Sequence, residues 1–219
     1  MFVDRRDAGR RLAAALADLK DEAPVVLALP RGGVPVAAEI AAALEAPLDV
    51  LIVRKIGLPD QPELAMGAVA EGDPPIVLRN EDVIQAARID AATFRAACAD
   101  EQAEIARRQA RYRGDRPPAT IAGRTVILVD DGLATGATAR AGVRALRRDG
   151  PARLVLAVPV GAPDSLAALS EEADAVVCLE TPAWFPAIGA FYEDFHQVPD
   201  AEVLTALAGR RAAERPGPD

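Results

Sequence analysis

Histidine and cysteine are scarce in this sequence. Its 219 residues include one histidine, His196, and two cysteines, Cys98 and Cys178. A metal site or catalytic triad based on histidine would have to use that one imidazole, and the cysteines are too far apart for metal-ligand spacing. We therefore interpret both cysteines as ordinary reduced thiols, which are typical of a cytoplasmic protein.

Long apolar runs are missing as well. No stretch approaches the ~20 consecutive apolar residues that span a bilayer. The N-terminal stretch MFVDRRDAGRRLAAAL has no hydrophobic segment followed by a cleavage site. From both observations we expect a cytoplasmic protein without a membrane partner.

Basic residues are fewer than acidic ones: 25 Lys and Arg against 33 Asp and Glu. The formal net charge is −8 and the sequence pI is about 4.8, which argues against nucleic acid as a partner. The only lysines are Lys20 and Lys55, and Lys55 stands inside an apolar segment, where it attracts attention. Hydrophobic residues make up 51% of the chain, so a packed core is expected rather than disorder.

Short apolar runs alternate with helical patterns along the chain. We expect strands at 24–30, 48–56, 75–80, 125–130, 153–161 and 175–180, and helices at 4–19, 34–46, 135–150, 163–174 and 200–211. Residues 57–75 read as a Gly- and Pro-rich loop with a short strand at AMGAVA, and 81–113 as one long helix or two. This alternation predicts a doubly wound, mostly parallel α/β sheet flanked by helices, in which ligands bind beyond the carboxyl ends of the strands.

The stretch TVILVDDGLATGAT, residues 125–138, ends a buried strand in two carboxylates, Asp130 and Asp131. A loop of small residues and hydroxyls follows and leads into a helix; it contains Gly132, Ala134, Thr135, Gly136, Ala137 and Thr138. Close backbone N–H groups and a helix N-terminus are typical of a phosphate cradle, although neither GxxxxGK[ST] nor GxGxxG is present. The two acids would repel a phosphate, so we expect them to face sugar hydroxyls or a hydrated Mg²⁺. The alternative is that they only end a strand and cap a turn.

This stretch resembles the phosphoribosyl pyrophosphate (PRPP) motif of type I phosphoribosyltransferases. LPRGGVPVA, VRKIG and DDGLATGAT together are similar to a bacterial subgroup of that family whose substrates are not generally assigned. The resemblance covers roughly residues 24–198. It implies one type I phosphoribosyltransferase-like domain over 1–219, with a core at about 24–180 and a small C-terminal hood at about 181–208. Residues 57–75 would be its mobile loop and 81–113 a helical insertion.

The resemblance also implies roles for particular residues. Asp130 and Asp131 would bind the ribose hydroxyls and, through water, Mg²⁺, and residues 134–138 would cradle the 5-phosphate. The diphosphate loop would consist of Arg31, Gly32 and Gly33, often with a strained or cis peptide. The candidates for stabilising charge on the leaving diphosphate are Arg31, Arg54 and Lys55. For Arg54 and Lys55 the alternative is solvation at a strand end.

The hood would hold the acceptor. Trp184 or Phe185 could stack on a base, or these aromatics could simply pack on an alanine-rich core. Ala134 stands where the 6-oxopurine branch of the family carries an acid, so a general base would come from elsewhere. Glu63, Glu193 and Asp194 are candidates, each of which could equally be a solvated surface acid.

The function so implied is Mg²⁺-dependent transfer of the 5-phosphoribosyl group from PRPP to a nucleobase or related nucleophile, as in nucleotide salvage. Two alternatives stay open: a catalytically silent PRPP-binding regulator, and a hydrolase or phosphorolytic enzyme acting on phosphorylated ribose compounds. The sequence does not identify the acceptor. A homodimer is expected only by analogy with the family.

Overall fold

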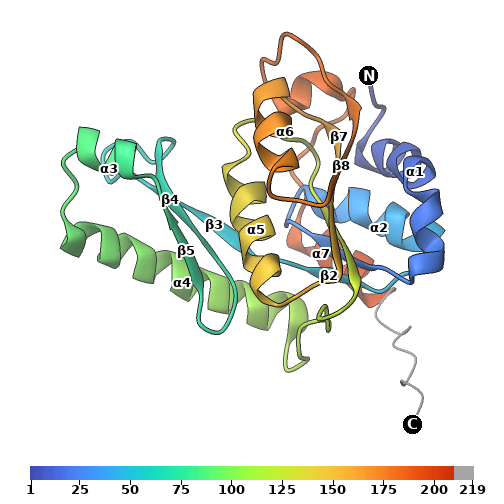
Figure 1. Cartoon of the computed structure of the whole chain (residues 1–219), viewed down its shortest axis with the longest axis horizontal. Helices are drawn as coiled ribbons and strands as arrows, with labels where there is room; N and C mark the ends of the chain where they lie inside the picture. The colour runs from blue at the N-terminus through green and yellow to red at the C-terminus, as the bar shows by residue number, and fades with distance from the viewer. Residues whose placement is uncertain (210–219) are drawn as a thin grey trace.

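A five-stranded parallel sheet forms the core of the computed structural model, which describes residues 1–209 (Figure 1). The strand order is β2-β1-β6-β7-β8, with every neighbouring pair parallel. The bounds are β1 Val25–Ala28, β2 Leu48–Val50, β6 Thr125–Val129, β7 Arg153–Val160 and β8 Ala175–Glu180. The predicted parallel α/β class is confirmed.

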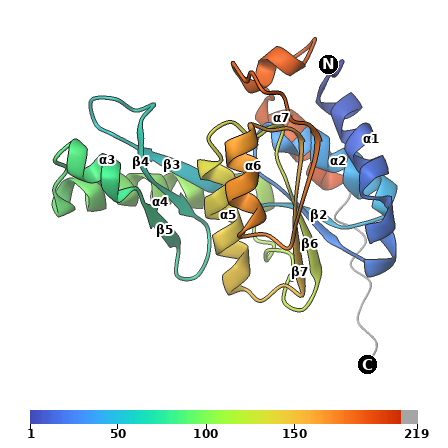
Figure 2. The same cartoon turned by 45° about the horizontal axis from the view of Figure 1, so that its top comes forward.

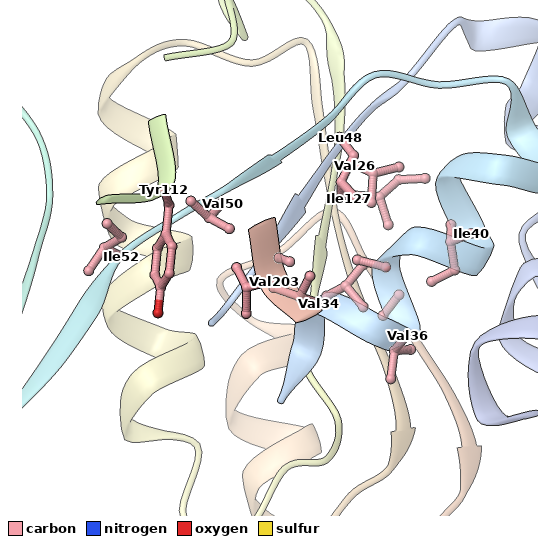
Figure 3. Close-up of a cluster of buried hydrophobic side chains, with 14 of the residues drawn as sticks. Val26, Val34, Val36, Ile40, Leu48, Val50, Ile52, Tyr112, Ile127 and Val203 are labelled. Carbon is pink, nitrogen blue, oxygen red and sulfur yellow. The ribbon is translucent and has the colours of Figure 1, made fainter. Parts of the chain in front are cut away.

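Helices cover both faces of this sheet. One face carries α1 Arg5–Ala15, α2 Gly33–Leu44 and α7 Asp200–Ala208, and the other carries α5 Ala137–Arg148 and α6 Pro163–Ser170. Successive strand residues point to opposite faces, so Val26 and Ile127 pack toward α2 while Val25 and Val126 pack toward α5. Figure 3 shows the α2 side, where Val26, Val34 and Ile40 belong to one buried cluster. Two buried faces explain why these strands are continuous apolar runs.

A second sheet, antiparallel, forms an arm that extends away from the core in Figures 1 and 2. The arm consists of β3 Val53–Gly57, β4 Ala65–Ala70, β5 Ile76–Arg79, α3 Glu81–Ala86 and α4 Ala91–Arg113. The strand expected at AMGAVA is therefore present as β4, and 81–113 contains two helices. The strand expected at 75–80 is β5 and belongs to the arm, not to the core sheet.

The single strand predicted over 48–56 is wrong. β2 ends at Val50 and β3 begins at Val53, in a different sheet. At the break, the N–H of Ile52 donates to the Glu71 carboxylate at 2.9 Å instead of to a core strand. The residues stay apolar where the chain passes from one sheet to the other, so the sequence pattern does not indicate the break.

The C-terminal segment from residue 181 returns to the N-terminus of the chain. It contains the short 3₁₀ helix Ile188–Phe191, and Phe2 pairs with Tyr192 in an isolated parallel bridge. The segment lies beside the N-terminus at the top of Figure 2. The predicted helix 200–211 corresponds to α7, and its last two residues lie outside the described part of the chain.

Among residues 1–209, no helix combines the length and the apolar character that crossing a membrane requires.

Candidate functional site

Two loops meet at the carboxyl edge of the core sheet, one after β1 and one after β6. Gly33 begins α2, and a Cβ atom on it would lie 2.6 Å from the Val129 carbonyl oxygen. A Cβ on Gly32 would collide with the Asp131 carboxylate. The predicted diphosphate loop and the predicted ribose site are thus in direct contact, and the contact requires glycine at both positions.

The loop from Gly132 to Thr138 leads into the N-terminus of α5. Gly136 adopts a left-handed φ of +72°, and no side chain of the described residues caps α5. Leu133 anchors the loop, because its N–H donates to Val160 O at 2.9 Å and its carbonyl accepts from Ala162 N. The tip at Ala134 and Thr135 is exposed. Free first-turn N–H groups beside an exposed loop can bind an anion.

The two acids of the motif have different surroundings. Asp130 is half-buried, and its Oδ1 accepts a hydrogen bond from Asp131 N at 2.9 Å. Burial raises the pKa of Asp130, and the charge on Asp131 raises it further. Asp131 is buried, and its Oδ2 accepts from Arg5 Nε at 2.8 Å. Burial raises the pKa of Asp131 as well, while the Arg5 guanidinium opposes that rise.

Sequence reasoning missed Arg5 and Tyr192. Arg5 lies in α1, far from the motif in sequence, where an arginine-rich helix gave no signal. The Tyr192 hydroxyl donates to the Asp131 carbonyl at 2.6 Å. Burial raises the pKa of Tyr192 above its ordinary range, so this hydroxyl remains a donor. The aromatic cluster of the tail, which contains Tyr192, was the available clue.

Arg31 follows a cis peptide bond between Pro30 and Arg31. A cis peptide at this position is what the family resemblance implied. The Arg31 side chain is about one-third exposed, and its Nη1 lies 3.8 Å from Asp200 Oδ1 at the start of α7. Its guanidinium is therefore accessible to a ligand at the diphosphate loop.

Arg54 and Lys55 lie on β3 of the arm, not at the carboxyl edge of the core sheet. Arg54 Nε donates to Glu101 Oε2 at 2.7 Å. Lys55 Nζ donates to the carbonyl of Glu63 at 3.0 Å and to its carboxylate at 3.1 Å. Within residues 1–209, neither cation has a hydrogen bond or ion pair to the diphosphate loop. Glu63, a candidate base, is thereby paired with Lys55.

The hood segment packs directly on the loop after β6. A Cβ on Gly132 would lie 2.5 Å from Ile188 Cγ2. Phe185 packs against Phe191 with ring centroids 5.2 Å apart, which favours the packing alternative for Phe185. Trp184, in contrast, is 78% exposed and free to contact a ligand.

The remaining base candidates and the histidine lie on the surface of the hood. His196 Nδ1 lies 3.1 Å from Asp194 Oδ1, and Nε2 lies 3.6 Å from Glu202 Oε2. Glu193 is exposed, and its N–H donates to the Phe2 carbonyl at 2.8 Å. Nothing in these contacts directs His196, Asp194 or Glu193 at the loop after β6.

Comparisons with known proteins find a family model and several relatives that match this chain. The phosphoribosyl transferase domain family matches residues 4–196. A Mycobacterium tuberculosis protein, Rv0571c in strain H37Rv and MT0597 in strain CDC 1551, is 49% identical over 207 residues, 94% of this chain. Its phosphoribosyl transferase name is itself a provisional assignment. The alignment covers 46% of that protein, so the chain spans about half the length of these relatives.

A solved structure supports the whole fold. The crystal structure of TT1426 from Thermus thermophilus is similar with a TM-score of 0.81 and 44% identity. The match covers 96% of this chain and 99% of TT1426. The match therefore extends over nearly all of this chain and is not limited to the core sheet.

Proposed function

Because the chain belongs to the phosphoribosyl transferase domain family, we propose that it transfers the 5-phosphoribosyl group of PRPP to a nucleobase or related nucleophile. One observation carries the proposal. The acid pair, the Arg31 loop and the N-terminus of α5, which no side chain within residues 1–209 caps, meet at one edge of the sheet. They supply the three contacts that a phosphorylated ribose bearing a diphosphate would need.

Each part of the edge suits one part of PRPP. The loop at 134–138 offers backbone N–H groups to the 5-phosphate, helped by the partial positive charge of α5. Asp130 offers a carboxylate to ribose hydroxyls. Arg31, with the backbone of Gly32 and Gly33, faces the diphosphate. In the reaction the nucleophile bonds to C1 as the C1–oxygen bond breaks, and the electron pair leaves with the diphosphate. Cations that stabilise this departing charge lower the barrier.

The donor set at this edge fits Mg²⁺. Among the described residues, no three His, Cys, Asp or Glu side chains gather as a metal site. Of the two carboxylate oxygens of Asp130, only Oδ1 accepts a hydrogen bond from a described residue, so Oδ2 could bind an ion. Mg²⁺ is usually held by one or two carboxylates, several waters and substrate phosphates, so Asp130 with PRPP oxygens would suffice. When bound, the ion would neutralise charge on the diphosphate.

The test is calorimetric titration with PRPP, with and without Mg²⁺, followed by diphosphate release over a panel of nucleobases. Asp130→Asn should weaken PRPP binding by about tenfold or more. Asp115→Asn, an exposed acid outside the site, is the matched control and should leave binding unchanged.

The outcomes separate the candidate functions. Mg²⁺-dependent binding with release for one base would support the transferase and name its acceptor. Binding without release for any base would favour a PRPP-sensing regulator. Release without an acceptor would favour a hydrolase. No binding at all would contradict the proposal.

A further inference from the structure

A buried arginine from the first helix reaches the second acid of the loop. Arg5 Nε donates to Asp131 Oδ2 at 2.8 Å, and the two side chains are only 8% and 11% exposed. Arg5 Nη1 donates to the His196 carbonyl at 2.8 Å, and the Arg5 guanidinium lies 3.8 Å from the centroid of the Phe195 ring. A guanidinium is costly to bury unless its charge and its donors are matched. Arg5 thus ties Asp131 to the hood.

The backbone of Asp131 is held from the same side. Tyr192 donates to its carbonyl, and the Tyr192 ring packs on Phe2 and Phe195 with centroids 5.4 and 5.0 Å apart. The segment carrying Phe2 is bonded to the hood, because Phe2 N donates to Phe191 O and Glu193 N donates to Phe2 O, both at 2.8 Å. The N-terminal segment and the hood thus act on Asp131 as one unit.

The Asp131 carboxylate also limits where the diphosphate loop can lie. It occupies the space that a Cβ on Gly32 would need. A shift of this carboxylate would therefore either open a gap beneath Gly32 or push the loop outward. Asp130 has no comparable contact, since only Asp131 N donates to its side chain among the described residues.

We propose that Arg5 is a positioning residue, which holds the Asp131 carboxylate under Gly32 and thereby sets the spacing between the diphosphate loop and the loop after β6. Asp131 thereby couples the hood and α1 to both loops. The identity of the ligand rests on the proposed function; the coupling does not.

The first test needs no ligand. Hydrogen–deuterium exchange is compared for wild type, Arg5→Gln and the control Arg6→Gln; Arg6 is the next residue of the same helix, with a half-exposed side chain that pairs with Glu39. In Arg5→Gln, exchange should rise at 31–33, 130–133 and 192–196 with little change in β7 and α5. A uniform rise, or a rise equal to that of the control, would overturn the proposal.

The second test uses PRPP as the probe. Arg5→Gln and Asp131→Asn should each weaken binding by about tenfold, and the double variant no more than the worse single one, because both break the same link. Arg5→Lys keeps the charge but not the planar fork, so it should restore only part of the affinity. Additive losses would mean that Arg5 does not act through Asp131.

Tyr192→Phe is a milder variant that keeps the test decisive if Arg5→Gln fails to fold. It removes one hydroxyl from the same unit and should reproduce the exchange changes at 130–133 on a smaller scale. Unchanged exchange there would contradict the role given to the hood. If wild type itself does not bind PRPP, the proposed function fails, and the exchange comparison alone decides the coupling.

Discussion

Asp200 influences how much of the Arg31 charge is free for a ligand. It accepts from the Tyr112 hydroxyl at 2.6 Å, pairs with Arg111 Nε at 3.0 Å and lies 3.8 Å from Arg31 Nη1. The hydrogen bond from Tyr112 and the nearby arginines lower the pKa of Asp200, which keeps it ionised. At the diphosphate loop, Asp200 is therefore a competitor for the charge that a diphosphate would use.

Asp200→Asn should consequently strengthen PRPP binding slightly, by about twofold, since a partly exposed ion pair is worth ~0.2–1 kcal/mol. It should also lower the free energy of unfolding by ~1 kcal/mol, because the Tyr112 and Arg111 contacts weaken. Calorimetric titration and thermal unfolding measure the two effects. Glu202→Gln, in the same first turn of α7, is the control for binding. A marked loss of affinity would show that Asp200 orients Arg31 instead of competing with the ligand.

The single histidine offers a clean pH probe of the hood. The hydrogen bond to Asp194 raises the pKa of His196 above its ordinary 6.5, and Glu202 adds to the rise. The protonated ring therefore favours the folded hood below pH about 6.5, and this contribution declines as the pH rises through the folded-state pKa. The ring-proton resonances of this one imidazole should titrate above 6.5, and Asp194→Asn should lower the pKa of His196 more than Glu202→Gln does. Equal or absent shifts would contradict these contacts.

What the sequence could reveal about the site depended on the range of each interaction. The loop after β6 is a contiguous signal, so its small residues and acids could be recognised directly. Arg5 acts across 126 residues of sequence, and only the closure of the fold brings it to Asp131. The functional roles of the site residues stay predictions. The meeting of the loops after β1 and β6 at one edge was foreseeable from parallel strands. The position of Arg54 and Lys55 on the arm was not.

At the scale of elements, a buried charge cluster joins the arm to the core. Arg113, at the end of α4, pairs with Asp49 of β2 at 3.0 Å and with Glu71 after β4 at 2.6 Å. It also donates to the Val50 carbonyl. All three charged side chains are less than a tenth exposed. The cluster sits where β2 passes into β3, so it fixes the point at which the arm leaves the core.

Arg113→Met should destabilise the fold strongly, because it removes the guanidinium that pairs with Asp49 and Glu71 in this buried cluster. Breaking a buried pair in this way costs ~3–5 kcal/mol, which corresponds to about 10 °C in the unfolding midpoint of a chain of this size. Arg107→Gln changes a mostly exposed residue of the same helix that pairs with Glu104, and it should cost little stability because exposed ion pairs contribute little. Thermal and denaturant unfolding compare the two. Equal effects would show that the cluster does not hold the arm root.

The same cluster explains why the strand at 48–56 was wrongly predicted. The pattern of apolar residues in a sequence indicates which residues are buried, and the residues on both sides of the break between β2 and β3 are buried. The decisive group is the Glu71 carboxylate, which takes the Ile52 N–H and comes from 19 residues further along the chain. Helices and core strands were predictable from local pattern; the exchange of one sheet for another was not.

At the scale of the whole molecule, the arm and the candidate site lie in different sheets, and α5 contacts the arm and also leads from the candidate site. Ala68 and Ala70 of β4 pack on the α5 side of the core, and a cavity of about 410 Å³ lies between the arm and the start of α5. Its lining includes Gly67 and Ala137. The family and the fold class are confirmed, while the mobility expected of residues 57–75 stays a prediction.

This arrangement predicts that the two groups of cations act at different stages. Arg31 lies at the diphosphate loop already, so Arg31→Gln should reduce both PRPP affinity and the rate of diphosphate release. Lys55 lies on the arm, paired with Glu63, so we expect it to reach a ligand only after the arm moves. Lys55→Gln should therefore leave the PRPP dissociation constant within about twofold and slow release by about tenfold or more, because it removes charge stabilisation only in the transition state.

Glu63→Gln tests whether Lys55 acts in the transition state or only solvates the end of β3. It removes the carboxylate charge beside Lys55 but keeps the cation and its hydrogen bond to the Glu63 carbonyl, so release should be unchanged or faster while PRPP affinity stays the same. Calorimetry measures the PRPP affinity, and an assay of diphosphate over time measures the rate of release. If Lys55→Gln weakens binding as much as it slows release, the arm already contacts PRPP in the bound ground state. If it changes neither, Lys55 only solvates the end of β3, and Arg31 is left as the principal cation for the leaving group.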